Sequence, residues 1–140
     1  MMEEIKLFTQ LPEEAMRIRK NVFVEEQGFH DEFDETDKNS LHAVLFSDGK
    51  AVGTARMFTE SGGKSYHIGR MAVIKEYRKH GCGRKIMDAL LAKAKELGAE
   101  SCELSAQCRA RGFYETLGFE ASGDVYLDEH CPHIYMRKTL

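Results

Sequence analysis

The chain has 140 residues, of which 42% are hydrophobic and 31% charged, and these values are typical of one globular domain, here residues 1–140. The formal net charge of −3 leaves no basic surplus for binding nucleic acid or an anionic membrane. No apolar run is long enough to cross a bilayer, and the N-terminal MMEEIKLFTQ has no apolar signal core, so we expect a cytoplasmic protein. The cysteines form no CxxC pair, which predicts free thiols.

The first forty residues predict a strand, a helix and a loop. Residues 5–8 alternate weakly in polarity and fit an edge strand. Pro12, which two glutamates follow, is a helix-start signature, and Gly28 ends the helix. Five carboxylates in the seven positions 31–37 predict a solvated acidic loop.

The next segment changes to an apolar period of two. This period predicts strands at 41–45, 51–59 and 66–74, and Asp48-Gly49 predicts a hairpin turn between the first two. In the third strand the apolar residues move from even to odd positions at Gly69. That slip predicts a β-bulge or a close backbone approach, unless the strand is buried on both faces, where parity carries little information.

The remaining residues predict two helices and three strands. Residues 83–97 carry an apolar stripe at helical spacing. The other expected elements are a strand at 102–106, a short helix at 109–117 and strands at 119–127 and 133–138. The order β-α-β-β-β-α-β-α-β-β predicts an α/β (α+β) protein, because the long helix must join parallel strands while the hairpins join antiparallel ones.

The strongest local signal is Arg78-Lys79-His80-Gly81-Cys82-Gly83-Arg84, between a strand and the long helix. Glycines let the backbone approach a ligand, and the first helical turn leaves its N–H groups unpaired. The helix dipole and three basic side chains add positive charge, so the segment fits an anion cradle. A surface turn before a helix explains the same residues. Neither a Walker loop nor a dinucleotide fingerprint is present.

Longer motifs give this segment a family context. The pattern R-x-x-G-x-G, after a strand that reads Ile68-Gly69-Arg70-Met71-Ala72-Val73, resembles the pyrophosphate-binding motif of the GNAT-type N-acetyltransferases. Residues 110–119, with Phe113-Tyr114-Glu115 and Leu117-Gly118-Phe119, resemble that family's second hallmark. Three further segments are similar to the ElaA/YjcF-like branch: Arg19-x-x-Val22-Phe23-Val24-x-Glu26-Gln27, Ala106-Gln107 and Pro132-His133-Ile134-x-Met136.

The resemblance implies a mixed, mostly antiparallel sheet with helices on both faces. This sheet would splay between its fourth and fifth strands and hold acetyl-CoA, as co-substrate, in the gap. Backbone groups of Met71 and Val73 would pair with the acetyl carbonyl and the pantetheine arm, and backbone N–H groups of residues 79–84 would hold the pyrophosphate. The expected cofactor-binding residues are Met71, Ala72, Val73, Arg78, Lys79, His80, Gly81, Cys82, Gly83 and Arg84. No metal is expected.

The resemblance also indicates catalytic residues. Tyr114 fits the family's general acid, which protonates the departing thiolate, and a phenol with an ordinary pKa of about 10 suits that role. The alternative is a core aromatic on a short helix. His133 is the best candidate for the base, because histidine ordinarily has a pKa of about 6.5; a structural histidine in the last strand explains it equally well. Glu26, directly or through water, is the alternative base.

Four residues are candidates for binding the acceptor: Arg19, Glu26, Gln27 and Arg70. Either arginine could bind a carboxylate or phosphate, and either could instead pair with an acid of residues 31–37. The acidic loop would attract a cationic amine, so these charges leave the acceptor unassigned. Ser105 stands where relatives often have an asparagine near the cofactor, which leaves one expected contact open.

Together these features predict an acetyl-CoA-dependent N-acetyltransferase that acts on a primary amine of a small molecule by direct attack in a ternary complex. One alternative is a non-catalytic acyl-CoA-binding sensor, and another is a protein N-terminal or lysine acetyltransferase. Tyr114 beside the cradle favours an enzyme. We expect no nucleic-acid or membrane partner, and homodimerisation stays open.

Overall fold

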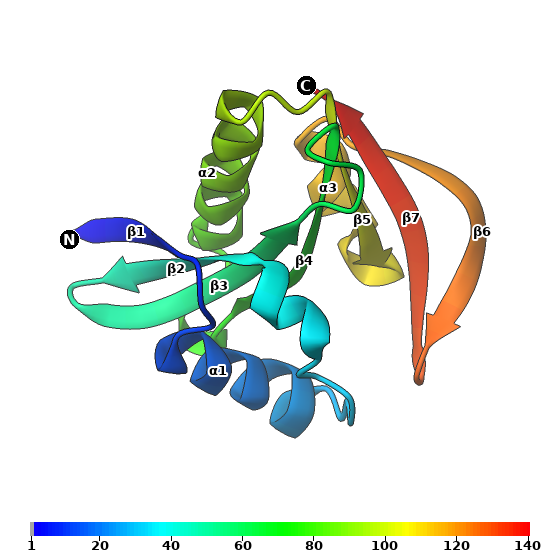
Figure 1. Cartoon of the computed structure of the whole chain (residues 1–140). Coiled ribbons are helices and arrows are strands. Elements are labelled where there is room, and N and C mark those ends of the chain that lie inside the picture. Colours follow the sequence, from blue (N-terminus) through cyan, green and yellow to red (C-terminus); the bar gives the residue numbers. More distant parts are fainter. Residues whose placement is uncertain (1) are drawn as a thin grey trace.

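The computed structural model describes residues 2–140 and contains one seven-stranded sheet in the order β1-β2-β3-β4-β5-β7-β6 (Figure 1). The strands are β1 (Glu3–Phe8), β2 (Leu41–Ser47), β3 (Lys50–Phe58), β4 (Ser65–Val73), β5 (Ser101–Gln107), β6 (Glu120–Asp128) and β7 (Cys131–Thr139). The pair β4–β5 is parallel and the other pairs are antiparallel. The prediction of a mixed, mostly antiparallel sheet, with β1 at its edge, is therefore confirmed.

Three α-helices accompany the sheet, in the predicted chain order. They are α1 (Glu13–Arg19), α2 (Cys82–Glu96) and α3 (Arg111–Thr116). A π-helical segment, Lys20–Glu26, extends α1, and short 3-10 helices occur at Glu35–Asn39, Lys75–Tyr77 and Cys108–Ala110. Within residues 2–140, no helix has both the length and the apolar character needed to span a membrane.

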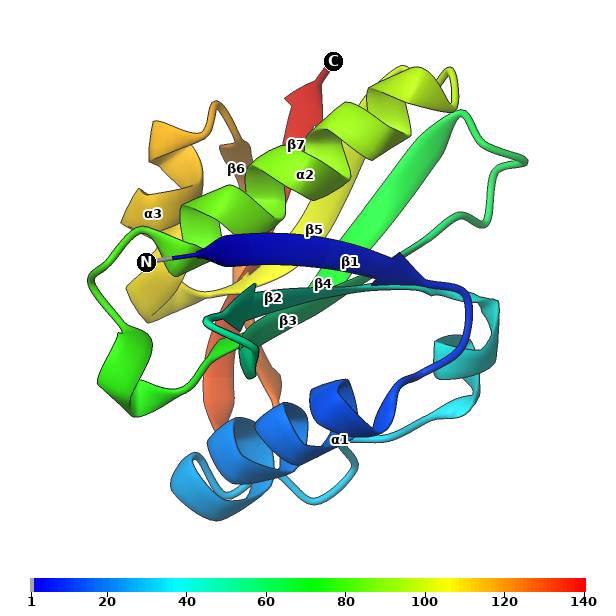
Figure 2. The same cartoon turned by 90° about the vertical axis from the view of Figure 1, so that its left-hand side faces the viewer.

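The helices cover opposite faces of the sheet, as predicted (Figure 2). The apolar stripe of α2, which includes Ile86, Leu90 and Ala94, is fully buried and shares a core with Tyr114 and the inner residues of β2 to β5. A second apolar cluster, formed by Ile18, Val22, Phe23, Phe29 and Ala72, holds α1 and the π-helical segment against the other face. Burial of these two sets of side chains fixes the sheet between the helices.

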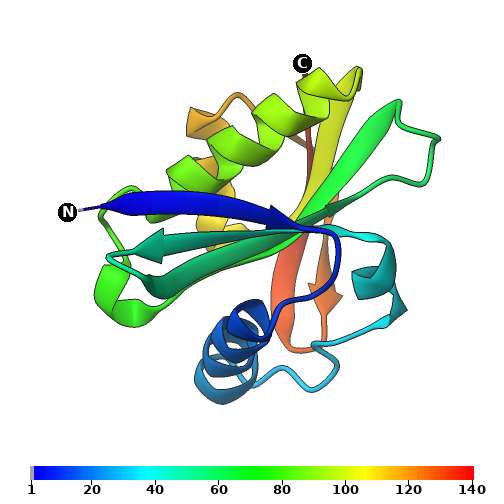
Figure 3. The ribbon, with the colours of Figure 1, turned by 60° about the vertical axis from the view of Figure 1, so that its left-hand side comes forward.

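The sheet opens between β4 and β5. These strands pair only at their first three positions, Ser65–Ser101, Tyr66–Cys102 and His67–Glu103, and then diverge. Figure 3 shows β5 and β7 running steeply away from the half of the sheet that contains β1 to β3. Beyond His67 the β5 side of β4 therefore has no strand partner. This confirms the expected splay between the fourth and fifth strands.

A β-bulge in β4 adjoins the splay. Gly69 pairs with Arg56 and Ala72 pairs with Thr54, so two residues of β4, Arg70 and Met71, oppose one residue of β3. The predicted irregularity at Gly69 is confirmed, but the residue in the left-handed conformation is Arg70, with a φ of 53°. A non-glycine residue in that conformation costs about 1–3 kcal/mol, and contacts elsewhere must offset the cost.

The acidic segment 31–37 differs from the prediction of a solvated loop. Three of its carboxylates and three arginines form a group that we call the ion-pair cluster: Arg19, Arg56, Arg70, Glu32, Asp34 and Asp37. Arg19 contacts Glu32 and Asp37 at 2.8 Å each, and Arg56 contacts Asp34 at 2.6 Å. The arginines come from α1, β3 and β4, so no pattern within the loop itself reveals them.

Candidate active site

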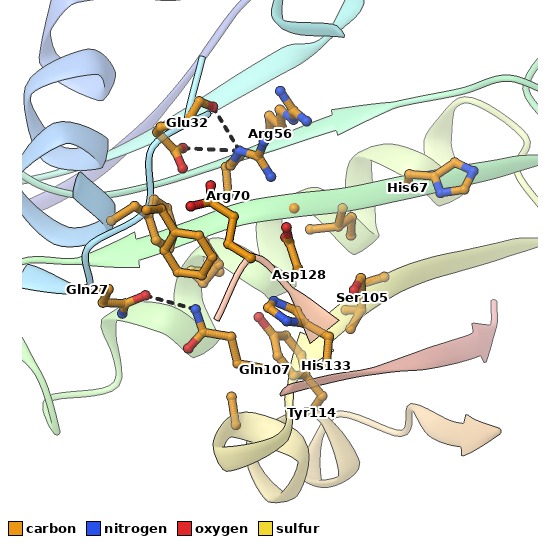
Figure 4. Close-up of a pocket in the computed structure, with 18 of the residues that line it drawn as sticks. Gln27, Glu32, Arg56, His67, Arg70, Ser105, Gln107, Tyr114, Asp128 and His133 are labelled. Carbon is orange, nitrogen blue, oxygen red and sulfur yellow. Dashed lines mark hydrogen bonds and ion pairs between the residues drawn. The ribbon is translucent and has the colours of Figure 1, made fainter. Parts of the chain in front are cut away.

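A cavity of about 430 Å³ lies at the splay, and we call it the splay cavity (Figure 4). Its walls come from the end of the π-helical segment, the loop after it, β3, β4, β5, α3 and the β6–β7 turn. Phe23, Phe29, Phe58 and Phe113 supply apolar surface, while the polar lining includes the residues labelled in Figure 4. The cavity thus combines apolar rings with convergent polar groups, a combination that small-molecule sites use to bind and orient a ligand.

Tyr114 lines this cavity from α3. Its side chain is 9% exposed and contacts the rings of Phe113 and Phe119 edge-on, at centroid distances of 5.0 and 6.0 Å. Burial raises the pKa of Tyr114 to about 12. Its hydroxyl makes no hydrogen bond to any group in residues 2–140. Tyr114 is thus a rigidly packed phenol that keeps its proton and has a donor available.

His133 lines the same cavity from β7. Its ring is 6% exposed, stacks on Tyr126 and meets Phe29 edge-on. The Nδ1 atom lies 2.9 Å from the carbonyl oxygen of Cys131. Because a carbonyl only accepts hydrogen bonds, Nδ1 carries the hydrogen in the neutral ring and Nε2 keeps a lone pair. This tautomer is the one that allows Nε2 to act as a base.

Several predicted site residues line the splay cavity together with Tyr114 and His133, namely Gln27, Arg70 and Met71. The side chain of Gln27 accepts a hydrogen bond from Gln107 at 2.9 Å, and Gln107 in turn accepts one from Arg109 at 2.8 Å. This chain of amides connects the π-helical segment to β5 across the opening of the sheet. Arg70 faces the cavity and also contacts Glu32 and Asp34, at 3.1 and 3.3 Å.

Two predicted acceptor-binding residues do not line the cavity. Arg19 is 1% exposed and its guanidinium is held by Glu32 and Asp37, so the alternative prediction, pairing with the acidic loop, describes its role. Both carboxylate oxygens of Glu26 accept hydrogen bonds from Arg78, at 2.6 Å each. These hydrogen bonds lower the pKa of Glu26 and occupy its oxygens, which makes it a poor proton acceptor.

The predicted anion cradle occupies the start of α2. Lys79 and Gly81 have positive φ values of 66° and 79°, and the first helical hydrogen bond runs from the Lys85 N–H to the Gly81 carbonyl at 3.1 Å. The N–H groups of residues 79–84 donate to no acceptor in the described part of the chain. They are therefore available to an anion, in agreement with the general behaviour of helix N-termini.

Arg78 has a different role from its neighbours in the cradle. Its guanidinium donates to the Val73 carbonyl at 2.8 Å as well as to Glu26, so its side chain anchors the loop instead of facing outward. At Gly83, a Cβ atom would lie 3.3 Å from Cζ of Phe113, a cavity residue. The absence of a side chain there lets α2 approach α3 and places the cradle beside the cavity.

The structure adds residues that the sequence motifs did not indicate. Asp128 and Glu129, at the β6–β7 turn, line the cavity. The Glu129 carboxylate accepts hydrogen bonds from the backbone N–H groups of His30 and Asp31, at 3.0 and 3.1 Å, and so joins the turn to the loop across the cavity. The contact spans 99 positions of sequence, and no local pattern signals it.

Comparison with known proteins identifies the class. Residues 9–140 match the acetyltransferase (GNAT) domain family, so the chain belongs to the GNAT family of acyl-CoA-dependent acyltransferases. The N-acetyltransferase YjcF of Bacillus subtilis is 36% identical over 129 residues, which cover 89% of this chain and 90% of YjcF. Escherichia coli ElaA matches with a TM-score of 0.87 and 24% identity, over 98% of this chain and 99% of ElaA.

A second solved structure has a similar degree of likeness. An acyl-CoA N-acyltransferase from Pseudomonas aeruginosa matches with a TM-score of 0.85 and 27% identity, over 98% of this chain and 99% of that one. Within the GNAT family, this chain belongs to the ElaA/YjcF-like branch.

Proposed function

We propose that the domain formed by residues 1–140 transfers an acetyl group from acetyl-CoA to a primary amine of a small molecule, by direct attack in a ternary complex. One observation carries this proposal: Tyr114, a protonated donor, and His133, whose Nε2 is free, line one cavity beside backbone N–H groups that donate to no acceptor in the described part of the chain. The GNAT membership supports the acyl-CoA chemistry.

The residues present fit acetyl-CoA, which supplies an activated thioester carbonyl when bound. The N–H groups of residues 79–84 suit its pyrophosphate. The Ile74 N–H donates to the Val52 carbonyl at 3.0 Å, so the backbone groups of Val73 point away from β3 and toward the splay. The Val73 carbonyl is already bonded to Arg78, which leaves its N–H group for the pantetheine arm.

The two catalytic side chains then divide the proton transfers. His133 accepts a proton from the arriving ammonium through Nε2, which frees the nitrogen lone pair to attack the carbonyl carbon. As the new C–N bond forms and the C–S bond breaks, Tyr114 donates its proton to the departing sulfur. The attacking nitrogen loses a second proton as the amide forms, and that proton restores the Tyr114 phenol. His133 releases its proton to solvent, so one proton is set free for each ammonium acetylated and the enzyme is restored.

Two features favour this function over the alternatives. A non-catalytic sensor needs the cradle but has no need of a phenol and an imidazole that face the same cavity. A protein acetyltransferase needs an open groove for a chain, whereas the contact of Glu129 with residues 30 and 31 closes this cavity on one side. A volume of about 430 Å³ suits a small molecule.

The proposal is tested by thermal unfolding with acetyl-CoA and by CoA release in the presence of primary amines. Acetyl-CoA is expected to raise the melting temperature of the wild type, and Gly83→Val to weaken its binding about tenfold or more, or about 1.4 kcal/mol. Ala92→Val, an exposed position on the same helix, is the matched control. A melting temperature that acetyl-CoA leaves unchanged, or no CoA release with any amine, would contradict the proposal.

A further inference from the structure

The charged groups that line the splay cavity are not balanced. Arg56 and Arg70, the arginines of the lining, belong to the ion-pair cluster, in which three arginines meet three carboxylates. Asp31, Asp128 and Glu129 line the cavity in addition, and no lysine or arginine of residues 2–140 pairs with them. The cavity therefore carries an excess of negative charge although it contains two arginines.

One carboxylate oxygen in the cavity wall lacks a partner. Glu32 is 5% exposed, and its Oε2 atom lies 2.8 Å from Nε of Arg19 and 3.1 Å from Nε of Arg70. Its Oε1 atom makes no hydrogen bond within residues 2–140. Figure 4 shows Glu32 at the cavity wall beside Arg70. This oxygen keeps its capacity to accept a hydrogen bond, and an ammonium group on a ligand would supply a charge-assisted donor.

Asp128 extends this acidic wall toward His133. Tyr126 of β6 pairs with His133 of β7, and Asp128 lies two residues further along β6, so Asp128 and His133 share one face of the hairpin. Diagonal neighbours of this kind lie about 7–8 Å apart. The Asp128 carboxylate makes no hydrogen bond or ion pair in the described part of the chain, and Figure 4 shows it among the lining side chains.

The reaction itself indicates what these carboxylates bind. The nitrogen that attacks the acetyl group must lose its proton, and nearby carboxylates oppose that loss because they stabilise the ammonium form. They favour binding only if they contact a second positive charge that does not react. The rings of Phe23, Phe29 and Phe58, which also line the cavity, provide the apolar surface that an alkyl spacer between the two charges requires.

We infer that the acceptor is an alkyl diamine with a short spacer, whose reacting nitrogen lies at His133 and whose second ammonium lies at the carboxylate wall formed by Asp31, Glu32 and Asp128. This inference rests on the proposed acetyl transfer and names its substrate class. Asp128 is the specificity-determining residue, because it is unpaired and lies diagonally across from His133. Glu32 is the buried anchor for the same ammonium.

Three amines of equal spacer length test the inference: trimethylenediamine, propanolamine and β-alanine. Their distal groups are positive, neutral and negative, and each has the same reacting amine. We expect kcat/KM to be highest for the diamine, at least about tenfold above propanolamine, and lowest for β-alanine. The preference for the diamine is expected to decrease as ionic strength rises, since the wall opens to solvent.

Variants then assign the preference to particular carboxylates. Asp128→Asn is expected to reduce the ratio of kcat/KM for trimethylenediamine over propanolamine about tenfold, chiefly through KM for the diamine. Asp124→Asn makes the same change of charge at an exposed position of β6 outside the cavity, and is expected to leave the ratio unchanged. Glu32→Gln, with its fold verified by thermal unfolding, is expected to reduce the ratio as well.

A calorimetric titration of trimethylenediamine into the protein with CoA separates this inference from the proposed function. Binding that Asp128→Asn weakens, without acetylation of any amine, would support the diamine site and reject the acetyl transfer. Acetylation of propanolamine as efficient as that of the diamine would overturn the diamine inference alone. A preference for β-alanine would also overturn it and would assign Arg70 to a carboxylate. If the diamine shows no measurable binding, the diamine inference is overturned, whether or not any amine is acetylated.

Discussion

Glu26 and Arg78 form a two-point ion pair, with both oxygen–nitrogen distances at 2.6 Å, between the π-helical segment and the loop that precedes α2. The Arg78 guanidinium also donates to the Val73 carbonyl at the end of β4. It therefore joins the π-helical segment, β4 and the loop before α2. The pair therefore connects the π-helical segment with the loop that leads into the predicted anion cradle. Its hydrogen bonds lower the pKa of Glu26 and raise that of Arg78, so both groups stay charged.

Glu26→Gln is expected to raise KM for acetyl-CoA up to about fivefold, because a partly exposed ion pair contributes up to about 1 kcal/mol to the position of the loop. The value of kcat is expected to stay within about twofold of the wild type, whereas loss of a general base lowers it about 100-fold or more. Glu25→Gln, the exposed neighbour, is the control. Steady-state kinetics with saturating amine decides between the two outcomes, and a collapse of kcat would identify Glu26 as the base.

Tyr114→Phe is expected to lower kcat about 100-fold or more while KM for acetyl-CoA changes little, since general acid catalysis contributes that much. The hydroxyl makes no hydrogen bond in the described chain, so the melting temperature is expected to stay near that of the wild type. Tyr77→Phe, outside the cavity, serves as the control. Unchanged turnover would remove Tyr114 as the acid.

The pH dependence of turnover offers a separate check on Tyr114. Its proton is the reactive form, and burial raises its pKa to about 12, so this form is lost only as the pH rises through that value. Deprotonation of Tyr114 is therefore expected to impose no alkaline limit on kcat at least up to about pH 10, the ordinary tyrosine value. An alkaline decrease in kcat below that pH which Tyr114→Phe abolishes would contradict the buried, protonated state.

His133→Gln is expected to reduce kcat about 100-fold, with KM for acetyl-CoA within about threefold, because the variant lacks a basic Nε2. His130→Gln changes a neighbouring histidine that packs on Phe29 but does not line the cavity, and it controls for disturbance of the turn. Turnover of His133→Gln close to that of the wild type would leave His133 a structural role in β7.

Ionisation of Asp37 is expected to make the free energy of unfolding depend on pH in the acid range. Burial alone raises the pKa of Asp37, but its hydrogen bonds and ion pairs with Arg19 and Arg56 outweigh this effect and lower the pKa to about 2. A group whose pKa is lower in the folded than in the unfolded state stabilises the fold above the unfolded value. That stabilisation, about 2 kcal/mol, is lost as the pH falls from about 4 to about 2.

Asp37→Asn is expected to lower the free energy of unfolding at neutral pH by about 3–5 kcal/mol, because it leaves two buried arginines short of a partner. Between neutral and acid pH, the free energy of unfolding is also expected to decrease less for the variant than for the wild type. Urea unfolding at neutral and acid pH measures both effects, with the exposed Glu35→Gln as the control. Equal stability of Asp37→Asn and the wild type would show that the ion-pair cluster does not hold the loop.

Most of the secondary structure follows from local patterns. The stripe of α2 and the alternation in β2 to β4 depend on spacing along the chain, and the parity slip at Gly69 indicated the bulge. The acidic segment 31–37 was misjudged because its partners, Arg19, Arg56 and Arg70, lie on three other elements. A run of carboxylates looks the same in sequence whether water or arginines surround it.

The sequence by itself determined the order of the elements, and it predicted the anion cradle and the two candidate catalytic side chains, because periodicity, turn chemistry and short motifs depend on neighbours in the chain. Only the tertiary structure decided that Arg19 and Arg78 hold the fold, that Nε2 of His133 is the free nitrogen, and that Asp128 lies near it. Ion pairs and tautomers depend on distances between elements that the chain separates by tens of residues. A ligand in the cavity therefore interacts mainly with the charged side chains that these ion pairs leave unpaired.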